Sequence, residues 1–227
     1  MSGDAGIKVG PGRGSKTGAG SSRRASRTAA PVPTKSALRS ELKEFTRERL
    51  ILAALTAFAE NGYRLTTVDS IVQLAGTTTT TFYRHFASKY DLIEPLRQHL
   101  QEHVQGVLQL LDSPEVWTRE GLRKWLDSYT AMWTDNQGLC EAYWEATHVE
   151  PDFARRAIPD MEIMIDSLTH LLAPLSKTER EPFRVKLSLL LLLADRAVYL
   201  AKISEADLGE AILDEFALIL FRSFASD

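Results

Sequence analysis

The stretch Thr66–Lys89, TTVDSIVQLAGTTTTTFYRHFASK, decides the fold. Apolar side chains recur at three- and four-residue spacing over residues 68–75, so we expect a short helix of about two turns that Thr66 or Thr67 opens. Gly76 is expected to end this helix, because glycine adopts a positive φ without strain and leaves room for a close helix approach.

A second short helix is expected after the glycine, capped by Thr78 and running to about His85. Phe82 and Phe86 are four residues apart, so both can pack inward on one face. The other face carries hydroxyl groups and a guanidinium, which suit phosphate oxygens and base edges in a major groove. Two short helices joined by such a turn, with a helix before them, predict a helix-turn-helix. A surface helix without a ligand is the alternative interpretation.

The flanking sequence predicts helices throughout. An apolar stripe over residues 50–58 predicts a helix that ends near Gly62 with a left-handed cap. Ser88 and Asp91 form a capping-box pattern for a fourth, longer helix, which Pro95 in its second turn should bend. Further helices are expected at about 114–134, 139–148, 152–172, 178–201 and 205–225. We therefore predict an all-α fold, with an N-terminal three-helix helix-turn-helix domain followed by a helical bundle.

Charge is distributed unevenly along the chain. The net charge of −3 divides into +6 for residues 1–36, +1 for residues 37–100 and −10 for residues 101–227. A basic front end favours a polyanionic partner, although a purely solubilising tail is an alternative. Seven of the 13 glycines also lie in residues 1–36, a composition typical of disorder. We expect a flexible basic arm at 1–40, a DNA-binding helix-turn-helix domain at 41–90 and a second helical domain at 91–227.

Composition excludes several protein classes. The chain of 227 residues has one cysteine, Cys140, so it has no intramolecular disulfide framework, and we interpret the thiol as a small buried apolar group. Residues 1–36 lack the apolar core of a signal peptide, and the longest apolar run, residues 187–194, is too short to span a bilayer. We expect a soluble, cytoplasmic protein without a membrane partner.

Signals of catalysis are weak. His99 and His103 share a helical face, but no third metal ligand has an evident spacing. Glu145 and His148 match one Glu-x-x-His element of a di-iron bundle, which needs a second copy that is not evident. Phosphate loops, nucleophile elbows and dinucleotide fingerprints are absent from the sequence. We predict no catalytic residue, no metal site and no cofactor.

From about Arg47 to Leu92 the sequence resembles the tetracycline-repressor (TetR) family of bacterial transcription regulators. The resemblance rests on Ala57-Phe58-Ala59-Glu60-Asn61-Gly62, Thr67-Val68, Ile71, Ala75-Gly76, Thr81-Phe82-Tyr83-Arg84-His85-Phe86 and Ser88-Lys89. The run Thr-Phe-Tyr-x-His-Phe, followed by Ser-Lys and preceded by Ala-Gly at this spacing, is far more specific than a bare helix-turn-helix pattern.

The resemblance implies a double-stranded DNA operator as partner and places the contacts residue by residue. Tyr83, His85 and Lys89 match positions where the family commonly contacts phosphates, and Thr67 lies at a helix start that approaches the backbone. The full set of expected DNA contacts is Thr67, Thr78, Thr79, Thr80, Thr81, Tyr83, Arg84, His85 and Lys89. Since the nearly neutral motif should bind weakly as one copy, a homodimer on a pseudo-palindrome is the expected form.

Two C-terminal helices look like a dimer frame. Residues 187–193 are apolar on nearly all faces, and residues 208–224 supply a second apolar stripe. Pairing these helices across a two-fold axis would form a four-helix interface, as the resemblance also implies. The alternative is the central helix of a monomer.

Aromatic side chains gather between residues 117 and 144. An aromatic stripe of this spacing is often plain core, and the functional alternative is an apolar effector cavity, which the resemblance favours. The expected lining residues are Trp125, Tyr129, Met132, Trp133, Tyr143, Trp144, His148, Met164 and Leu168. Their inventory suggests a small lipophilic or aromatic effector.

The sequence therefore predicts a ligand-responsive homodimeric repressor. An effector would favour a spacing of the two recognition helices that no longer fits successive grooves. The rival classes are a small-molecule sensor whose helix-turn-helix binds protein and an all-α enzyme. An activator, or a DNA-binding dimer without a ligand, are rivals within the same class.

Overall fold

The computed structural model describes residues 34–224, except the side chains of residues 157 and 158. Every regular element in this range is helical, which confirms the all-α prediction. The first part of this range contains α1 (Lys35–Leu65), α2 (Val68–Leu74), α3 (Thr79–His85) and α4 (Ile93–Leu108). The remainder contains α5 (Arg119–Asp135), α6 (Gln137–Val149), α7 (Pro151–Ala154), α8 (Ala157–Asp166), α9 (Thr169–Leu172), α10 (Lys177–Ile203) and α11 (Ala206–Phe224). Short 3₁₀ turns occupy Lys89–Leu92, Gln109–Asp112 and Pro114–Val116.

The predicted helix-turn-helix forms from local signals. Thr67 and Ser70 make a reciprocal capping box at the start of α2. Gly76 has φ +60° and ends the α2 segment, and the Thr78 hydroxyl accepts a hydrogen bond from Thr81 N at the start of α3. Phe82 is fully buried, and it anchors α3 against α1 and α2. Each of these features agrees with the sequence prediction.

The first helix differs from expectation at its start. Thr34 caps α1 by accepting a hydrogen bond from Ala37 N at 3.3 Å, so residues 35–40 are helical and not part of a flexible arm. The strong helix formers that follow Thr34 explain this correction. Residues 1–33 of the predicted arm lie outside the described range. At the other end, the left-handed residue falls where it was predicted, at Gly62, with φ +72°.

Prolines restart helices where the sequence analysis expected continuous ones. The fourth helix was expected to begin at Ser88 and bend at Pro95, but a 3₁₀ turn comes first and α4 begins at Ile93. Pro95 therefore lies in the first turn, where its missing N–H needs no partner. The helix expected at 152–172 divides into α7, α8 and α9, and Pro159 in the first turn of α8 accounts for the first of these breaks.

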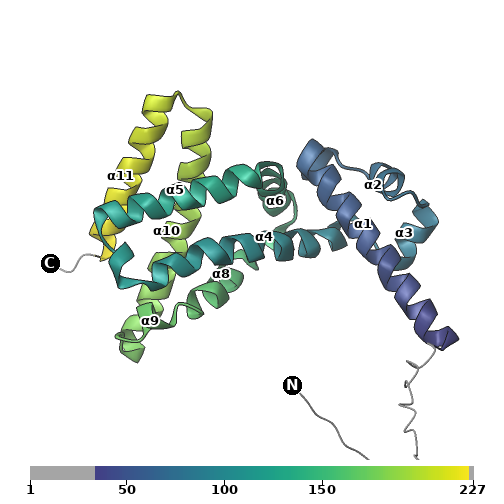
Figure 1. Cartoon of the computed structure of the whole chain (residues 1–227), viewed down its shortest axis with the longest axis horizontal. Helices are drawn as coiled ribbons and strands as arrows, with labels where there is room; N and C mark the ends of the chain where they lie inside the picture. Colours follow the sequence, from purple (N-terminus) through teal and green to yellow (C-terminus); the bar gives the residue numbers. More distant parts are fainter. Residues whose placement is uncertain (1–33, 225–227) are drawn as a thin grey trace, which may run out of the picture.

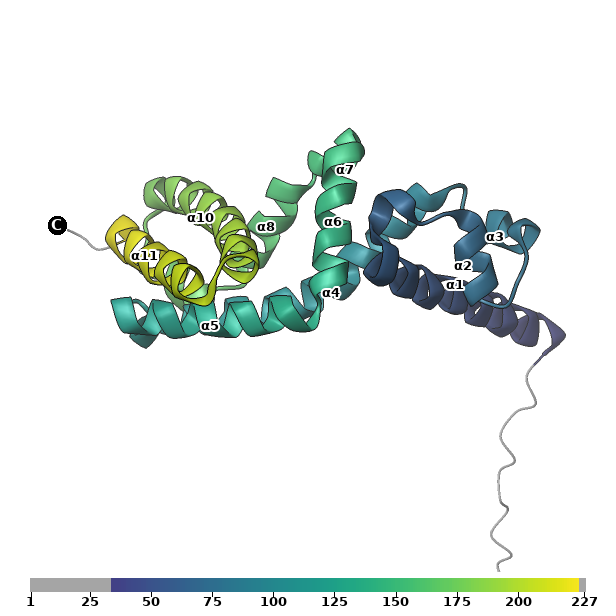
Figure 2. The same ribbon diagram turned by 90° about the horizontal axis from the view of Figure 1, so that it is seen from above.

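The helices form two lobes joined by α4 and α6 (Figure 1). The helices α1, α2 and α3 lie together at one end, and the α10–α11 hairpin lies at the other (Figure 2). The helix α6 packs against α1, and Gly138 on α6 lies so close to the Ala59 backbone that a Cβ would come within 2.2 Å of its carbonyl oxygen. One buried apolar cluster extends from α1 to α11. Within residues 34–224, no helix is both long enough and apolar enough to cross a membrane.

Candidate functional sites

The outer face of α3 presents polar and aromatic side chains to solvent. Phe82 and Phe86 are turned inward, while Thr80, Tyr83 and Arg84 are exposed and Thr79 is half-buried. The Tyr83 side chain is 59% exposed, although its ring packs edge-on against that of Phe82 with centroids 5.4 Å apart. The backbone of α3 therefore holds a tyrosine and an arginine outward on an anchored helix, as the sequence predicted.

Three of the threonines already use their hydroxyl groups within the motif. The Thr67 hydroxyl accepts a hydrogen bond from Ser70 N, and the Thr78 hydroxyl lies 3.1 Å from that of Thr81. These residues define where α2 and α3 begin. The hydroxyls of these three threonines hold the helix starts and so position the outer face of α3. The hydroxyls of Thr79 and Thr80 make no hydrogen bond among the described residues.

His85 is surrounded by positively charged side chains. Its Nδ1 is buried and has no hydrogen-bond partner among the described residues. Burial lowers the pKa of His85, and the positive charges of Lys43, Arg84 and Arg47 lower it further, against a smaller opposite effect of Glu44. Hence the imidazole is kept neutral in the DNA-free protein, and a positive patch lies beside α3.

Lys89 has a structural partner that the sequence analysis did not foresee. Its ammonium donates to the carbonyl oxygens of Tyr63 at 2.6 Å and Thr66 at 2.8 Å, with Arg64 O at 3.4 Å. It also lies 4.4 Å from the centroid of the Tyr63 ring. Burial lowers the pKa of Lys89, and Glu150 and Glu145 partly oppose this shift. The side chain thus caps the C-terminal end of α1, an arrangement that leaves its three donors occupied.

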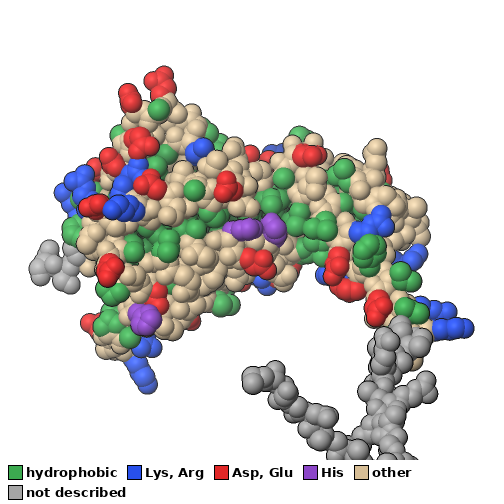
Figure 3. All heavy atoms as spheres, in the orientation of Figure 1, with side chains coloured by type: hydrophobic (Ala, Val, Ile, Leu, Met, Phe, Trp, Pro, Cys, Tyr) green, Lys and Arg blue, Asp and Glu red, His purple; other side chains and the backbone are tan. Residues whose placement is uncertain are grey.

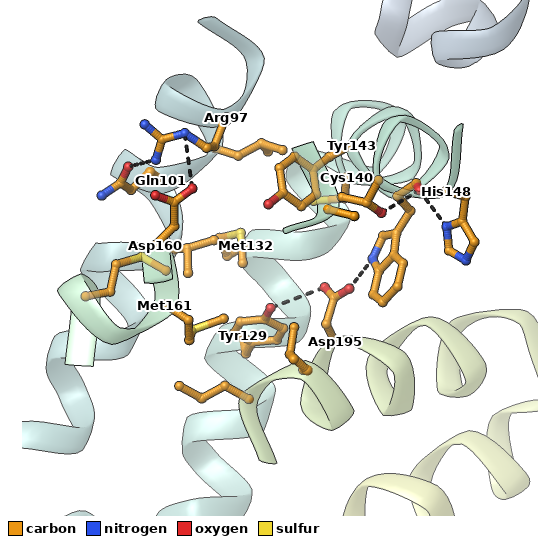
Figure 4. Close-up of a pocket in the computed structure, with 18 residues that line it drawn as sticks. Arg97, Gln101, Tyr129, Met132, Cys140, Tyr143, His148, Asp160, Met161 and Asp195 are labelled. Atoms are coloured by element: carbon orange, nitrogen blue, oxygen red, sulfur yellow. Dashed lines mark hydrogen bonds and ion pairs between the residues drawn. The ribbon is translucent and has the colours of Figure 1, made fainter. Parts of the chain in front are cut away.

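A cavity of about 320 Å³ opens within the C-terminal lobe, which is in the size range of small-molecule sites. Its wall combines side chains of α4, α5, α6, α8 and α10 (Figure 4). The apolar part of the wall consists of Leu100, Val104, Met132, Met161, Met164, Leu191 and Leu192. Cys140 also faces the cavity, and burial raises the pKa of its thiol to about 12. A thiol with this pKa stays protonated and unreactive.

Six of the nine residues expected around an effector do line this cavity. They are Tyr129, Met132, Tyr143, Trp144, His148 and Met164. Trp125, Trp133 and Leu168 do not line this cavity, and each is buried in the core. The indole of Trp125 instead donates to Val107 O at 3.0 Å, and Trp133 packs against Tyr199.

The sequence analysis missed the charged groups of the cavity. Asp195 on α10 lies at one end, where Tyr129 Oη donates to its Oδ1 at 3.2 Å and Trp144 Nε1 donates to its Oδ2 (Figure 4). Burial raises the pKa of Asp195, and these two donors and Arg196 oppose the shift. A single carboxylate after the apolar run 187–194 was the available signal, since a charge on an otherwise apolar helix needs a reason.

At the other end of the cavity, Arg97 is fully engaged. Its guanidinium donates to Glu94 at 2.5 and 3.0 Å and to Gln101 Oε1 at 2.6 Å. Asp160 Oδ2 lies 3.6 Å from Arg97 Nε, so two carboxylates balance this one cation. Burial raises the pKa of the neighbouring Tyr143 to about 12, and Asp160 adds to the shift.

The helix α6 connects the cavity with the end of α1. One face of α6 contributes Tyr143 and Trp144 to the cavity wall. From the same helix, Glu145 Oε2 accepts a hydrogen bond from Arg64 N at 2.9 Å. Just beyond α6, Glu150 Oε1 accepts one from Tyr63 Oη at 2.8 Å. A shift of α6 would therefore move the end of α1 and, through Lys89, the turn that follows α3.

The histidine pair and the Glu-x-x-His element have other surroundings. The rings of His99 and His103 lie with centroids 5.1 Å apart, and a histidine patch is visible on the surface over α4 (Figure 3). Within residues 34–224, no three His, Cys, Asp or Glu side chains are grouped so that they could hold a metal ion. Glu145 bonds the α1 backbone, and His148 Nδ1 lies 2.8 Å from Trp144 O.

An apolar stripe remains exposed on the outer face of the α10–α11 hairpin. On α10 it follows helical spacing, and on α11 it continues near both ends of the helix. The stripe consists of Val185, Leu189, Leu193, Leu200, Ile203, Leu208 and Ile219. By helical spacing the five residues on α10 share one face of that helix.

The comparisons with known proteins agree with this geometry. Residues 50–96 match the family model described as bacterial regulatory proteins, tetR family. The transcriptional activator FasR of Mycolicibacterium smegmatis is 27% identical over 82% of this chain and 80% of its own length. The transcriptional regulator TcmR of Streptomyces glaucescens is 40% identical, but over only 27% of each chain.

Solved structures share the fold. A TetR-family regulator from Pectobacterium atrosepticum superposes with a TM-score of 0.55 at 21% identity, covering 85% of this chain and 96% of its own. A TetR-family regulator from Mesorhizobium loti superposes with a TM-score of 0.53 at 18% identity, covering 80% of this chain and 97% of its own. The helix-turn-helix and the sequence match centred on it make residues 50–96 of this chain similar to the DNA-binding segment of tetR-family transcription regulators.

Proposed function

We propose that the chain binds a palindromic operator as a homodimer and is released by a small lipophilic or aromatic effector, which makes it a repressor. The observation that carries this proposal is the anchored helix α3, which presents Tyr83 and Arg84 outward inside the segment that matches the family model. Its target would place the protein in the cytoplasm.

The DNA-binding surface would be the outer face of α3 with the adjoining start of α1. Thr79, Thr80, Tyr83 and Arg84 would enter the major groove, and Lys43 and Arg47 would add positive charge toward phosphates. Thr67, Thr78, Thr81 and Lys89 would act mainly by fixing the motif, given their hydrogen bonds within it. We divide the chain accordingly into a DNA-binding domain at 35–90 and an effector and dimerisation domain at 91–227.

The dimer would form through the α10–α11 hairpin. Its exposed stripe would be covered by the same stripe of a second copy, which satisfies the self-complementarity that a two-fold interface requires. Two recognition helices would then meet half-sites one turn of the duplex apart. The cavity of about 320 Å³ would hold the effector, and α6 would transmit its binding to α1.

The direction of regulation has a second candidate. The relative FasR is named a transcriptional activator and aligns with most of this chain, which supports activation as that second candidate. A reporter under a promoter that carries the selected operator distinguishes the two: deletion of the regulator raises expression for a repressor and lowers it for an activator.

Selection from random duplexes, followed by gel retardation, tests DNA binding. Arg84→Ala should weaken binding and reduce the slope of affinity against salt, because one phosphate or base contact is lost. Arg119→Ala on α5 is the matched control, since it removes an equally exposed arginine from the far lobe. No selected duplex, or equal effects of the two variants, would contradict the proposal.

A further inference from the structure

Asp195 is a half-buried carboxylate on α10 that faces the cavity without an ion-pair partner among the described residues. It lines the cavity and accepts one hydrogen bond on each oxygen, from Tyr129 and from Trp144. Within residues 34–224 it forms no ion pair with a lysine, arginine or histidine. A buried carboxylate without a counter-ion is unfavourable, and proteins retain one mainly where it has a partner.

The carboxylate also has unused acceptor capacity. Each carboxylate oxygen can accept about two hydrogen bonds, and each Asp195 oxygen receives one from the side chains described. Figure 4 shows the Asp195 side chain turned toward the cavity beside Tyr129. A donor that enters the cavity can therefore add hydrogen bonds without displacing either partner.

The rest of the cavity does not favour an anion. Arg97 is the only arginine or lysine among the lining residues, and each of its three nitrogens already donates to Glu94 or Gln101, with Asp160 beside it. Counted along the wall, one cation faces two carboxylates, Asp160 and Asp195. An acid that enters would meet this net negative charge and an occupied guanidinium.

The middle of the cavity is apolar and adaptable. Met132, Met161 and Met164 lie between its two polar ends, and methionine side chains adjust to irregular ligands and contact aromatic rings well. Such a wall suits an alkyl or aryl body that carries one polar head.

We propose that the effector is a cationic amphiphile, an alkyl- or arylalkylamine whose ammonium group donates hydrogen bonds to Asp195. This inference rests on the proposed effector function of the cavity and names its chemical class. Tyr129 and Trp144 turn their O–H and N–H groups to the carboxylate, which holds it in place to receive such a head. Burial raises the pKa of Asp195, and a bound cation would reverse that shift.

Isothermal titration calorimetry of the full chain with three matched probes tests the inference. The probes are 4-phenylbutylamine, 4-phenylbutanol and 4-phenylbutanoate, which share one apolar body and differ in head-group charge. We expect the amine to bind wild-type protein on the order of tenfold more tightly than the other two, the gain typical of one charge-assisted hydrogen bond. Absence of amine binding, or equal or tighter binding of the alcohol or acid, would overturn the inference.

Two variants locate the preference. Asp195→Asn should abolish it, whereas Asp135→Asn, which removes an exposed carboxylate of α5 outside the cavity wall, should preserve it. If Asp195→Asn still prefers the amine, the inference is contradicted. If this variant does not fold, the order in which the wild-type protein binds the three probes tests the inference alone. Operator release is measured separately by fluorescence anisotropy. An amine that binds without releasing DNA contradicts the effector function only, and an acid that binds best and releases DNA contradicts the inference only.

Discussion

At the scale of single residues, the structure separates side chains that can contact DNA from those that hold the motif together. Tyr83 and Arg84 point outward without partners among the described residues, while Lys89 is bonded to backbone carbonyls. Residue type alone could not distinguish these roles, because a lysine next to a recognition helix suits both. The distinction depends on where the end of α1 lies in space.

Lys89→Ala should therefore reduce the stability of the fold. Removing the ammonium leaves the carbonyls of Tyr63 and Thr66 without their donor, which should lower the free energy of unfolding by about 1–3 kcal/mol. Urea denaturation measures this change, and Arg84→Ala should leave the free energy of unfolding nearly unchanged. If Lys89→Ala weakens DNA binding while stability is unaffected, the side chain contacts phosphate and does not act as a cap.

His85 should make DNA binding dependent on pH. In the free protein its pKa is lowered by burial and by Lys43, Arg84 and Arg47, so it is neutral at pH 7. DNA phosphates would offset those cations and raise the pKa, so the complex binds a proton that the free protein lacks. Affinity should then increase as the pH falls toward the ordinary histidine range, by at most about tenfold per pH unit for one proton. Fluorescence anisotropy at constant ionic strength measures this slope. His85→Gln should flatten it, and a slope that persists in that variant assigns the proton to another group.

At the scale of helices, local sequence signals predicted the helix-turn-helix. They did not predict which side chains face the cavity, because tertiary packing determines that. The α2–α3 turn could be predicted because Thr67, Gly76 and Thr78 determine the backbone only of residues close to them in the sequence. The aromatic stripe of α5 could not reveal which rings reach the cavity, because that depends on α6 and α10. Tyr129 faces the cavity and Trp125 faces the core, although they are four residues apart on one helix.

The contact between α6 and α1 should carry the effector signal. Gly138→Ala places a Cβ 2.2 Å from Ala59 O, far inside van der Waals contact, and backbone atoms cannot move aside cheaply. The two helices must separate, so we expect a loss of about 1–3 kcal/mol in stability and weaker coupling between cavity and DNA. Anisotropy of labelled operator with and without amine measures the coupling.

Gly106→Ala is the matched control for this prediction. Gly106 lies in α4, where no other atom lies within 4 Å of the position that an added methyl group would take. Alanine there should stabilise the helix by about 0.5–1 kcal/mol and leave the coupling unchanged. Coupling that remains intact in Gly138→Ala, despite its lower stability, would mean that the signal bypasses this contact.

At the scale of the whole molecule, two distant surfaces must cooperate. The DNA-binding face of α3 lies at one end, and the apolar stripe of the α10–α11 hairpin lies at the other (Figure 2). A single copy of the motif carries little net charge, so tight binding requires two copies held at a fixed spacing. In the proposed dimer, the exposed stripe and the DNA-binding face would therefore depend on each other even though they share no contact.

Leu193→Glu should abolish both the dimer and operator binding. Leu193 is 54% exposed in the middle of the α10 stripe, and a carboxylate there would face its symmetry mate across a desolvated interface. Ile163→Glu on α8 is the control, because Ile163 is 65% exposed and lies off the stripe. Sedimentation equilibrium should show a monomer for Leu193→Glu and a dimer for wild type and Ile163→Glu. Gel retardation should then show that only the monomeric variant fails to shift the full palindrome. If Leu193→Glu remains dimeric, the two copies meet through another surface and the spacing of their recognition helices must be derived from that one.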